Sequence, residues 1–387
     1  RFLLGFFFGM LAMAVVAGGV GTGLYFANQN TSGKTISEKT SQKLDYINKL
    51  IDAKFLNKVN ESDLEDGIYK GLLEGLNDPY SVYYTAEEYR RMMEQTSGTY
   101  SGIGALVSQN AETGIITVVK AFADAPAAKA GVKNGDIIYK VKGKEVTGVD
   151  INNVVTEMKG EKGTTVDITV YRESEKKYID FTITRDQVNE PTVEYKMLDK
   201  KKKIGYIQIS QFEEVTYDQF TKALDDLKKQ GMKAVIFDVR SNPGGLYEIV
   251  CKMLDEILPE GNLVSTKDKY GNEEKQTSDS KCLDMPMVVL QNKDSASASE
   301  IFAGAIQDFN AGKIVGTQSF GKGIVQTILP LSDGSAVKLT VQDYYTPSGK
   351  NIHGKGITPD VEAELEENAT SDTQLEKAKE TIMELMK

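Results

Sequence analysis

The sequence has no tryptophan, one histidine and only two cysteines among its 387 residues. Cys251 and Cys282 are too few and too scattered for a disulfide framework or a zinc site, although one bridge between them remains open. We therefore expect no metal site and no cofactor. A mechanism that needs histidine would have to use His353.

An excess of positive charge is also absent, because 46 Lys and Arg residues stand against 56 Asp and Glu residues, for a net charge of -10. A general attraction to nucleic acid is therefore not expected, and we predict no nucleic-acid partner. Hydrophobic residues make up 40% of the chain and charged residues 26%, which is typical of a globular protein. The length allows two or three domains.

The N-terminal segment has no charged residue from position 2 to position 33. Its apolar run is longer than the apolar region of a cleaved secretory signal and long enough to cross a bilayer. We predict a transmembrane anchor at residues 1–27 and a polar stalk at 28–39. This indicates a single-pass protein of the cell membrane, with its main body outside the cytoplasm.

The rest of the chain divides by its hydrophobic periodicity. Residues 40–95 have helical spacing, and their amphipathic helices suggest packing or dimerisation, with a helical lid as the alternative. Residues 96–186 contain short β-rich runs separated by turns, which predicts a compact β module. Residues 187–365 alternate strands and helices, as in an α/β layer with parallel strand pairs. A helical tail is expected at 366–387.

One candidate functional segment is "DVRSNPGGL", at residues 238–246, directly after a buried strand. Gly244 and Gly245 allow backbone N–H groups to turn outward, as a site for an oxyanion or carboxylate requires. A tight structural turn explains the same letters and is the stronger interpretation of this motif taken alone.

A second candidate is the serine-rich stretch "SASASE" between an apolar strand and a helix. Ser299, followed by Glu300, fits an N-cap or a first-turn position. Ser297 lies at the strand-to-helix corner, where its hydroxyl would be exposed and the helix N-terminus would stabilise negative charge. Ser297 is therefore a candidate nucleophile.

A serine nucleophile needs a base, and the chain offers His353 or a lysine. Lys322 lies between glycines in "SFGKGIVQ", and Gln326 follows at an even separation that puts both side chains on one face of a strand. A lysine base must be neutral, so burial must lower its pKa by roughly three units, or about 4 kcal/mol. A neutral glutamine can accept its N–H without restoring a counter-charge.

Several ordered motifs resemble the carboxy-terminal processing peptidases, the tail-specific serine proteases with an internal PDZ domain. They are "GLNDPYSVYYTAEE", "YSGIGALV", "AGVKNGDIIYKVKGKEVTG", "DVRSNPGGL", "SASASEI", "FGKGIVQ" and "TPSGKNIHGKGITPD". The resemblance implies a crotonase-like α/β protease core at 187–365 with an inserted β-rich PDZ domain at 96–186. An N-terminal helical region and one transmembrane helix complete the expected fold class.

The resemblance also implies roles for residues that match the family's motifs. Ser297 corresponds to the nucleophile, Lys322 to the base and Gln326 to the residue that orients the lysine. The oxyanion hole would be formed by the N–H of Ala298 and one glycine of the Pro-Gly-Gly turn. The sequence does not distinguish Gly244 from Gly245 in this role.

The predicted PDZ site is the "GIGA" turn, formed by Gly102, Ile103, Gly104 and Ala105. Its backbone N–H groups can bind a chain-terminal carboxylate, and the adjacent strand edge can pair with an extended peptide. A β module used only for packing is the alternative. Lys159 stands where family members often carry arginine, so a role that needs a planar bidentate group is not expected there.

The resemblance implies a membrane-anchored, ATP-independent serine endopeptidase with a Ser–Lys dyad that cleaves proteins near their C-termini after PDZ recognition of the tail. Its expected partners are proteins or peptides with accessible C-termini, the membrane through the N-terminal helix, and a second copy through the helical regions. One alternative is a membrane-tethered PDZ scaffold with an inactive core. Another is a crotonase-like acyl-CoA enzyme.

Overall fold

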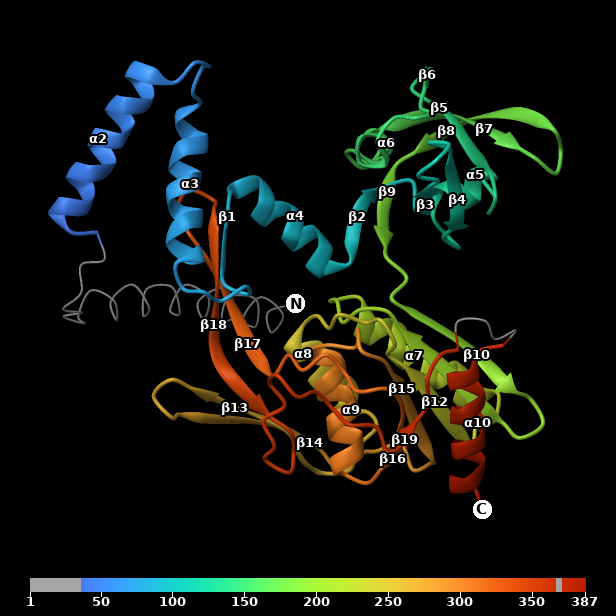
Figure 1. The fold of residues 1–387 in the computed structure, drawn as a ribbon. Coiled ribbons are helices and arrows are strands. Elements are labelled where there is room, and N and C mark those ends of the chain that lie inside the picture. The colour runs from blue at the N-terminus through green and yellow to red at the C-terminus, as the bar shows by residue number, and fades with distance from the viewer. Residues whose placement is uncertain (1–35, 367–370) are drawn as a thin grey trace, which may run out of the picture. The chain divides into compact units, whose positions relative to one another are not determined.

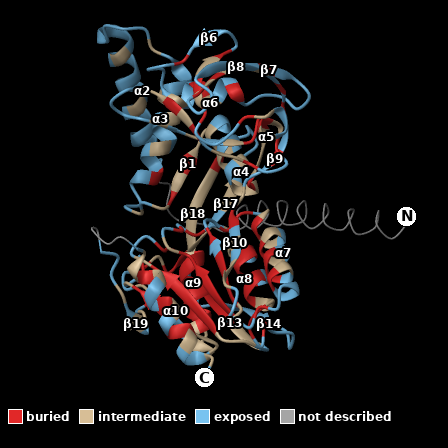
Figure 2. Cartoon of the chain, turned by 90° about the vertical axis from the view of Figure 1, so that its right-hand side faces the viewer, coloured by how far each residue is buried: buried red, intermediate tan, exposed pale blue. Residues whose placement is uncertain are grey.

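The computed structural model describes residues 36–366 and 371–387. The chain divides into two compact units, with the boundary after Ile68. The first unit contains α2 (Glu38–Lys54) and the beginning of α3 (Glu61–Glu74). Helix α2 has no buried residue, and most of it has the colour of exposed residues in Figure 2. Tyr46, Ile47 and Leu50 form an exposed apolar face on it.

The predicted fold class must be corrected where it included a transmembrane helix. Within residues 36–366 and 371–387, every helix is too short or too polar to cross a bilayer. The segment 1–27, to which the helix was assigned, lies outside the described residues. A location outside the cytoplasm rested on the same segment and stays a prediction.

The region predicted to form the α/β core, residues 187–365, contains a mostly parallel sheet, in agreement with the predicted α/β class. Its strand order is β10-β11-β12-β15-β16-β19, and only the β10–β11 pair is antiparallel. These strands are β10 (Val193–Asp199), β11 (Ile204–Ile209), β12 (Ala234–Asp238), β15 (Met287–Gln291), β16 (Gly312–Gly316) and β19 (Val361–Glu362).

Helices cover both faces of this sheet, which explains why its central strands are apolar throughout (Figure 1). Alternate residues point to opposite faces: Val235 and Phe237 join the core under α7, α8 and α9, whereas Ala234 and Ile236 pack with α10. The helices are α7 (Thr216–Lys229), α8 (Tyr247–Asp255), α9 (Ala298–Asp308) and α10 (Thr373–Leu385).

A second, antiparallel sheet was not anticipated from the sequence. Strand β18 lies between β1 and β13, β14 pairs with β13, and β17 also pairs with β18. Strand β1 falls inside the region predicted to be helical, because three residues are too few to show a period. The strands are β1 (Val82–Tyr84), β13 (Gly261–Asp268), β14 (Glu273–Ser278), β17 (Ile324–Pro330) and β18 (Ala336–Tyr345).

Helix α4 (Ala86–Ser97) follows β1 and begins with a capping box of Thr85 and Glu88. It leads into β2 (Thr99–Gly102), which pairs with β9 (Asp186–Asn189). Between these two strands the chain forms the β module, whose sheet has the order β3-β4-β5-β7-β8, with β6 on β5. The proposed limits of 96–186 for this module stay a prediction.

The β module has its own core, centred on residues such as Ile116, Val141 and Val170. Its elements are β3 (Ala105–Gln109), β4 (Ile116–Ala121), α5 (Pro126–Ala130), β5 (Ile137–Val141), β6 (Lys144–Glu145), α6 (Ile151–Met158), β7 (Thr165–Arg172) and β8 (Lys177–Thr184).

Candidate active site

Ser297 occupies a strained turn between β15 and α9. Its φ of 56° and ψ of -114° are unusual for a residue with a side chain, and it is the N-cap of α9. The hydroxyl of the buried Tyr344 donates to its carbonyl oxygen at 3.2 Å. Such a sharp strand-to-helix turn presents a side chain at the mouth of a helix, as a nucleophile elbow does.

Ser299 occupies the second of its two expected positions, the first turn of α9. It is fully buried, and its hydroxyl donates to the carbonyl oxygen of Asn242 at 2.9 Å. Ser299 therefore fastens α9 to the Pro-Gly-Gly turn, and the cap position belongs to Ser297.

Glu300 is the main residue that the sequence interpretation missed. Its side chain is fully buried, and one carboxylate oxygen accepts the backbone N–H groups of Ser297 and Lys322, each at 2.8 Å. The other oxygen accepts the Ser319 hydroxyl and the Gly321 N–H, each at 2.6 Å. One carboxylate thus holds together the segments that contain the predicted nucleophile and the predicted base. The Ser-x-x-Glu spacing was a visible signal, but it indicated only a capping box.

Lys322 precedes β17, and its ammonium nitrogen lies 4.7 Å from the centroid of the Tyr80 ring. Burial lowers the pKa of Lys322 below the ordinary lysine value, and the positive charge of Lys338 lowers it further. Asp78 and Glu300 act in the opposite direction without reversing the shift. Burial and Lys338 therefore shift the Lys322 pKa in the direction that a general base requires.

Gln326 lies on β17, just after a register shift, and opposes Thr340 on β18. Its amide nitrogen is buried and has no hydrogen-bond partner in the part of the chain that the structure describes. Over the same residues, no hydrogen bond joins the Ser297 hydroxyl, the Lys322 amine and Gln326. The structure brings their segments together but leaves the three side chains unconnected.

The Pro-Gly-Gly turn lies directly against Ser297. A Cβ atom on Gly244 would be 2.8 Å from the Cβ of Ser297 and 3.0 Å from the nitrogen of Ala298, so this approach requires glycine. The Gly244 N–H already donates a hydrogen bond to the side-chain oxygen of Asn242, at 2.9 Å. By contrast, the N–H groups of Gly245 and Ala298 have no partner among residues 36–366 and 371–387.

A pocket of about 820 Å³ opens over this turn, and Gly245, Ser297, Ala298 and Gln326 line it. The backbone of His353 lies behind the Lys322 loop, where a Cβ on Gly323 would be 2.6 Å from the His353 nitrogen. The His353 side chain is exposed and makes no hydrogen bond within the described residues.

The predicted peptide site in the β module is a turn between β2 and β3. Gly102 ends β2, Gly104 has a φ of 74°, and Ala105 begins β3. Strand β3 is an edge strand that pairs only with β4 among the described strands. Ile103 is buried, and its carbonyl oxygen accepts the N–H of Ala127 at 2.7 Å, which anchors the turn.

Tyr100 and Lys159 lie beside this turn. A Cβ on Gly102 would be 3.0 Å from a ring carbon of Tyr100, and the Lys159 ammonium lies 4.8 Å from the centroid of that ring. Lys159 thus acts as a cation over an aromatic face, a contact that needs no planar bidentate group.

Neither cysteine is bonded: Cys251 is buried and Cys282 is exposed, which answers the question of a bridge. Within the described residues, His, Cys, Asp and Glu side chains form no group of three that could hold a metal ion.

The α/β core, the β module and the N-terminal region each match the model of a known protein family. Residues 203–363 match the model of peptidase family S41, residues 101–183 match the PDZ domain, and residues 13–88 match the N-terminal domain of the activating protease CtpB. The chain belongs to peptidase family S41, which confirms the predicted resemblance.

Curated relatives include probable CtpA-like serine proteases of Staphylococcus epidermidis and Staphylococcus aureus. The first is 38% identical over 324 residues, or 83% of this chain and 65% of that protein. The second is 37% identical over 341 residues, or 87% of this chain and 67% of that protein. The chain therefore spans about two thirds of the length of these relatives. The solved photosystem II D1 C-terminal processing protease is 29% identical, with a TM-score of 0.50 over 85% of this chain and 88% of that one.

Proposed function

We propose that this protein is a serine endopeptidase that cleaves polypeptides near their C-termini, with Ser297 as nucleophile and Lys322 as general base. The observation that carries the proposal is the Glu300 carboxylate, which accepts the backbone N–H groups of both residues. Because the two segments share one buried anchor, their side chains are restricted to the same small region. The similarity to the solved photosystem II D1 C-terminal processing protease supports the choice of substrate.

In the proposed reaction, neutral Lys322 takes the proton from the Ser297 hydroxyl as its oxygen attacks the scissile carbonyl carbon. The N–H groups of Ala298 and Gly245 donate to the resulting oxyanion, since both residues line the pocket and neither N–H has another partner within the described residues. The lysine then gives its proton to the leaving amine, and a water molecule hydrolyses the acyl-enzyme. Gly244 has a different part, because its N–H is used to shape the turn.

This chemistry requires a side-chain movement. The Lys322 amine lies over the Tyr80 ring, a contact that favours its charged form, and it must turn toward Ser297 to act as a base. Gln326 has a buried amide without a partner and would orient the lysine after that movement.

In the β module, the N–H groups of the Gly102–Ala105 turn would bind the substrate's terminal carboxylate, and the free edge of β3 would pair with its last residues. The exposed apolar face of α2 favours a homodimer through the helical region, since such faces are usually covered. Light scattering of the full chain and of Leu50→Glu would test the dimer.

The competing function is a PDZ scaffold with an inactive core, which the unconnected Ser297, Lys322 and Gln326 side chains favour. Digestion of a C-terminally tagged peptide by the full chain and by Ser297→Ala separates the two functions. We expect cleavage by the first protein only. Absence of cleavage by the unmodified chain, under conditions where it binds the peptide, would support the scaffold.

A further inference from the structure

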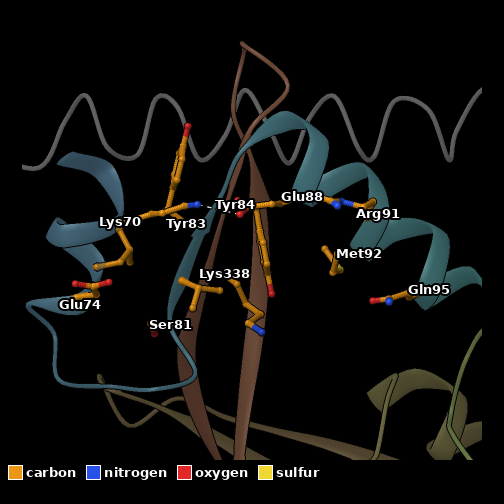
Figure 3. A pocket seen from close by; sticks show the side chains of 12 residues that line it. Lys70, Glu74, Ser81, Tyr83, Tyr84, Glu88, Arg91, Met92, Gln95 and Lys338 are labelled. Carbon is orange, nitrogen blue, oxygen red and sulfur yellow. Dashed lines mark hydrogen bonds and ion pairs between the residues drawn. The ribbon is translucent and has the colours of Figure 1, made fainter. Parts of the chain in front are cut away.

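A second pocket, of about 580 Å³ (Figure 3), shares lining residues with the pocket over Ser297, which is called the catalytic pocket below. Its walls come from α3, β1, α4 and β18, elements that the proposed reaction does not use. Met92, Gln95 and Lys338 line both pockets, so the two spaces share a wall. A polypeptide bound over Ser297 therefore lies within reach of these three side chains.

Lys338 lies on the face of the sheet that also carries Gln326. Gln326 opposes Thr340, and Lys338 opposes Ile328, two residues further along the same pair of strands. Because side chains alternate between faces, all four point to one side of the sheet. Lys338 is thus about 7 Å along the strand from the level of Gln326, which is the length of two extended residues.

Lys338 differs from the other cations of this pocket in having no counter-ion. Lys70 pairs with Glu88 at 2.9 Å, and Arg91 lies 3.7 Å from Glu87. Throughout residues 36–366 and 371–387, the Lys338 ammonium has no ion pair and no hydrogen bond.

The Lys338 ammonium is held in place by an aromatic ring. It lies 5.5 Å from the ring centroid of Tyr84, and Figure 3 shows the two side chains near the centre of the pocket. The carboxylate-bearing residue Glu74, on α3, lies at the left of the same view, apart from Lys338. A partly buried cation that contacts only an aromatic face can bind an anion without first breaking an ion pair.

We propose that Lys338 is a specificity-determining residue that binds a substrate carboxylate about two residues from the scissile bond. The spacing takes the level of Gln326 as that of the scissile bond, because Gln326 and Ser297 line the same pocket. The carboxylate is either an Asp or Glu side chain of the substrate or, in a peptide that ends there and does not reach the β module, its C-terminal carboxylate. This inference rests on the proposed peptidase function, because it places the substrate between Ser297 and Lys338.

Lys338 has a second, separable effect on the catalytic pocket. Its positive charge contributes to the lowered pKa of Lys322, after the larger effect of burial. Replacement by a neutral residue raises the pKa of Lys322 and moves the pH dependence of cleavage to higher pH. A ratio of rates for two substrates at the same pH cancels this effect and reports carboxylate recognition alone.

The experiment measures kcat/KM of the full chain on two pairs of fluorogenic peptides. One pair differs in a C-terminal carboxylate or carboxamide, and the other in Glu or Gln two residues from the scissile bond. The variants are Lys338→Gln and Lys338→Arg. The control is Lys275→Gln, which removes an exposed lysine from β14 of the same sheet.

We expect the unmodified protein and Lys275→Gln to prefer the carboxylate member of at least one pair by about tenfold. Lys338→Gln should reduce this preference to less than about twofold, and Lys338→Arg should retain most of it. The pair that responds identifies the source of the carboxylate. An unmodified protein without preference, or a preference that survives in Lys338→Gln, overturns the proposal.

The same peptides also test the site by binding, which separates it from catalysis. In Ser297→Ala, calorimetry should show about tenfold weaker binding of the preferred carboxylate peptide when Lys338→Gln is added, and unchanged binding of its neutral partner. Equal losses for both peptides overturn the proposal. If the unmodified protein cleaves nothing but this difference in binding is present, the proposed peptidase function fails and the carboxylate site stands.

Discussion

Two buried glutamates in the protease core lie in very different surroundings. Glu300, at the start of α9, accepts four hydrogen bonds from two segments of the chain. Glu213, in the loop between β11 and α7, has a buried carboxyl oxygen without a partner in the described part of the chain. Burial, followed by the charge of Glu190, raises the pKa of Glu213 to about 7.

The difference shows that hydrogen bonding, and not burial by itself, decides what a buried carboxyl group contributes. A carboxylate that accepts several N–H and O–H groups can replace its hydration shell and organise a site. A carboxyl group with an unsatisfied oxygen is instead driven toward its neutral form. We therefore expect changes near Glu300 to alter turnover and changes at Glu213 to alter stability.

The largest expected effect is on the residues that Glu300 holds. Ser297→Ala and Lys322→Ala should each lower kcat by at least about 10³-fold, because they remove the nucleophile and the base. Lys322→Arg should fail equally, since guanidinium does not lose its proton near neutral pH. His353→Ala should keep most of the activity. Peptide cleavage measures all four, and an active Lys322→Ala protein would contradict the lysine mechanism.

The next largest effect on kcat is expected from replacing Glu300, with the same replacement of Glu213 for comparison. Glu300→Gln should lower kcat by about 100-fold, because an amide cannot accept all four hydrogen bonds and the Ser297 and Lys322 segments separate. Glu213→Gln is the matched control and should stay within about threefold of the unmodified rate. Circular dichroism would show that both variants fold. Similar rates for the two variants would remove the proposed distinction.

A smaller effect is expected in the pH dependence of kcat/KM, which reports the protonation of Lys322. The rate should rise with pH as Lys322 loses its proton, with a midpoint below the ordinary lysine value of 10.5, because burial lowers its pKa. The profile should be the same in His353→Ala. A midpoint that disappears with His353 would assign the base to histidine.

The smallest effect on activity, but a clear one on stability, is expected at Glu213. Its folded pKa of about 7 exceeds the ordinary value of 4.5, so folding favours the protonated form. This contribution is complete below about pH 4.5 and is lost as the pH rises to about 7. Glu213→Gln should therefore gain stability relative to the unmodified protein between pH 4.5 and pH 8, by a few kcal/mol. Denaturant unfolding of both proteins at pH 4.5 and pH 8 measures this gain. If the two proteins differ in unfolding free energy by the same amount at both pH values, the raised pKa of Glu213 is contradicted.

Some of these features were predictable from local patterns. The buried strands and amphipathic helices of the core follow from apolar runs and helical periodicity, and the Thr85 capping box follows from four letters. Ser297 and Lys322 were found because the mechanism limits the residue types that can serve and the ordered motifs limit their positions. Their catalytic roles stay predictions.

Other features depend on contacts between distant segments. Strand β1 pairs with β18 across more than 250 residues, so its short apolar pattern could not be assigned in advance. The predicted transmembrane helix could not be judged by pattern alone either, and it has no counterpart in the described structure.

The sequence by itself determined the family, the α/β character of the core and the chemistry available to it, because one histidine and a lysine between glycines leave few possible bases. Tertiary structure alone decided how the groups are used. Glu300 joins two loops because residues 319–322 fold back onto α9. Asn242 accepts the N–H of Gly244, whereas that of Gly245 has no partner in the described part of the chain. Lys338 lines the pocket over Ser297 because β18 pairs with β17. Hydrogen bonds and charges act over a few ångströms of space, whatever the separation along the chain.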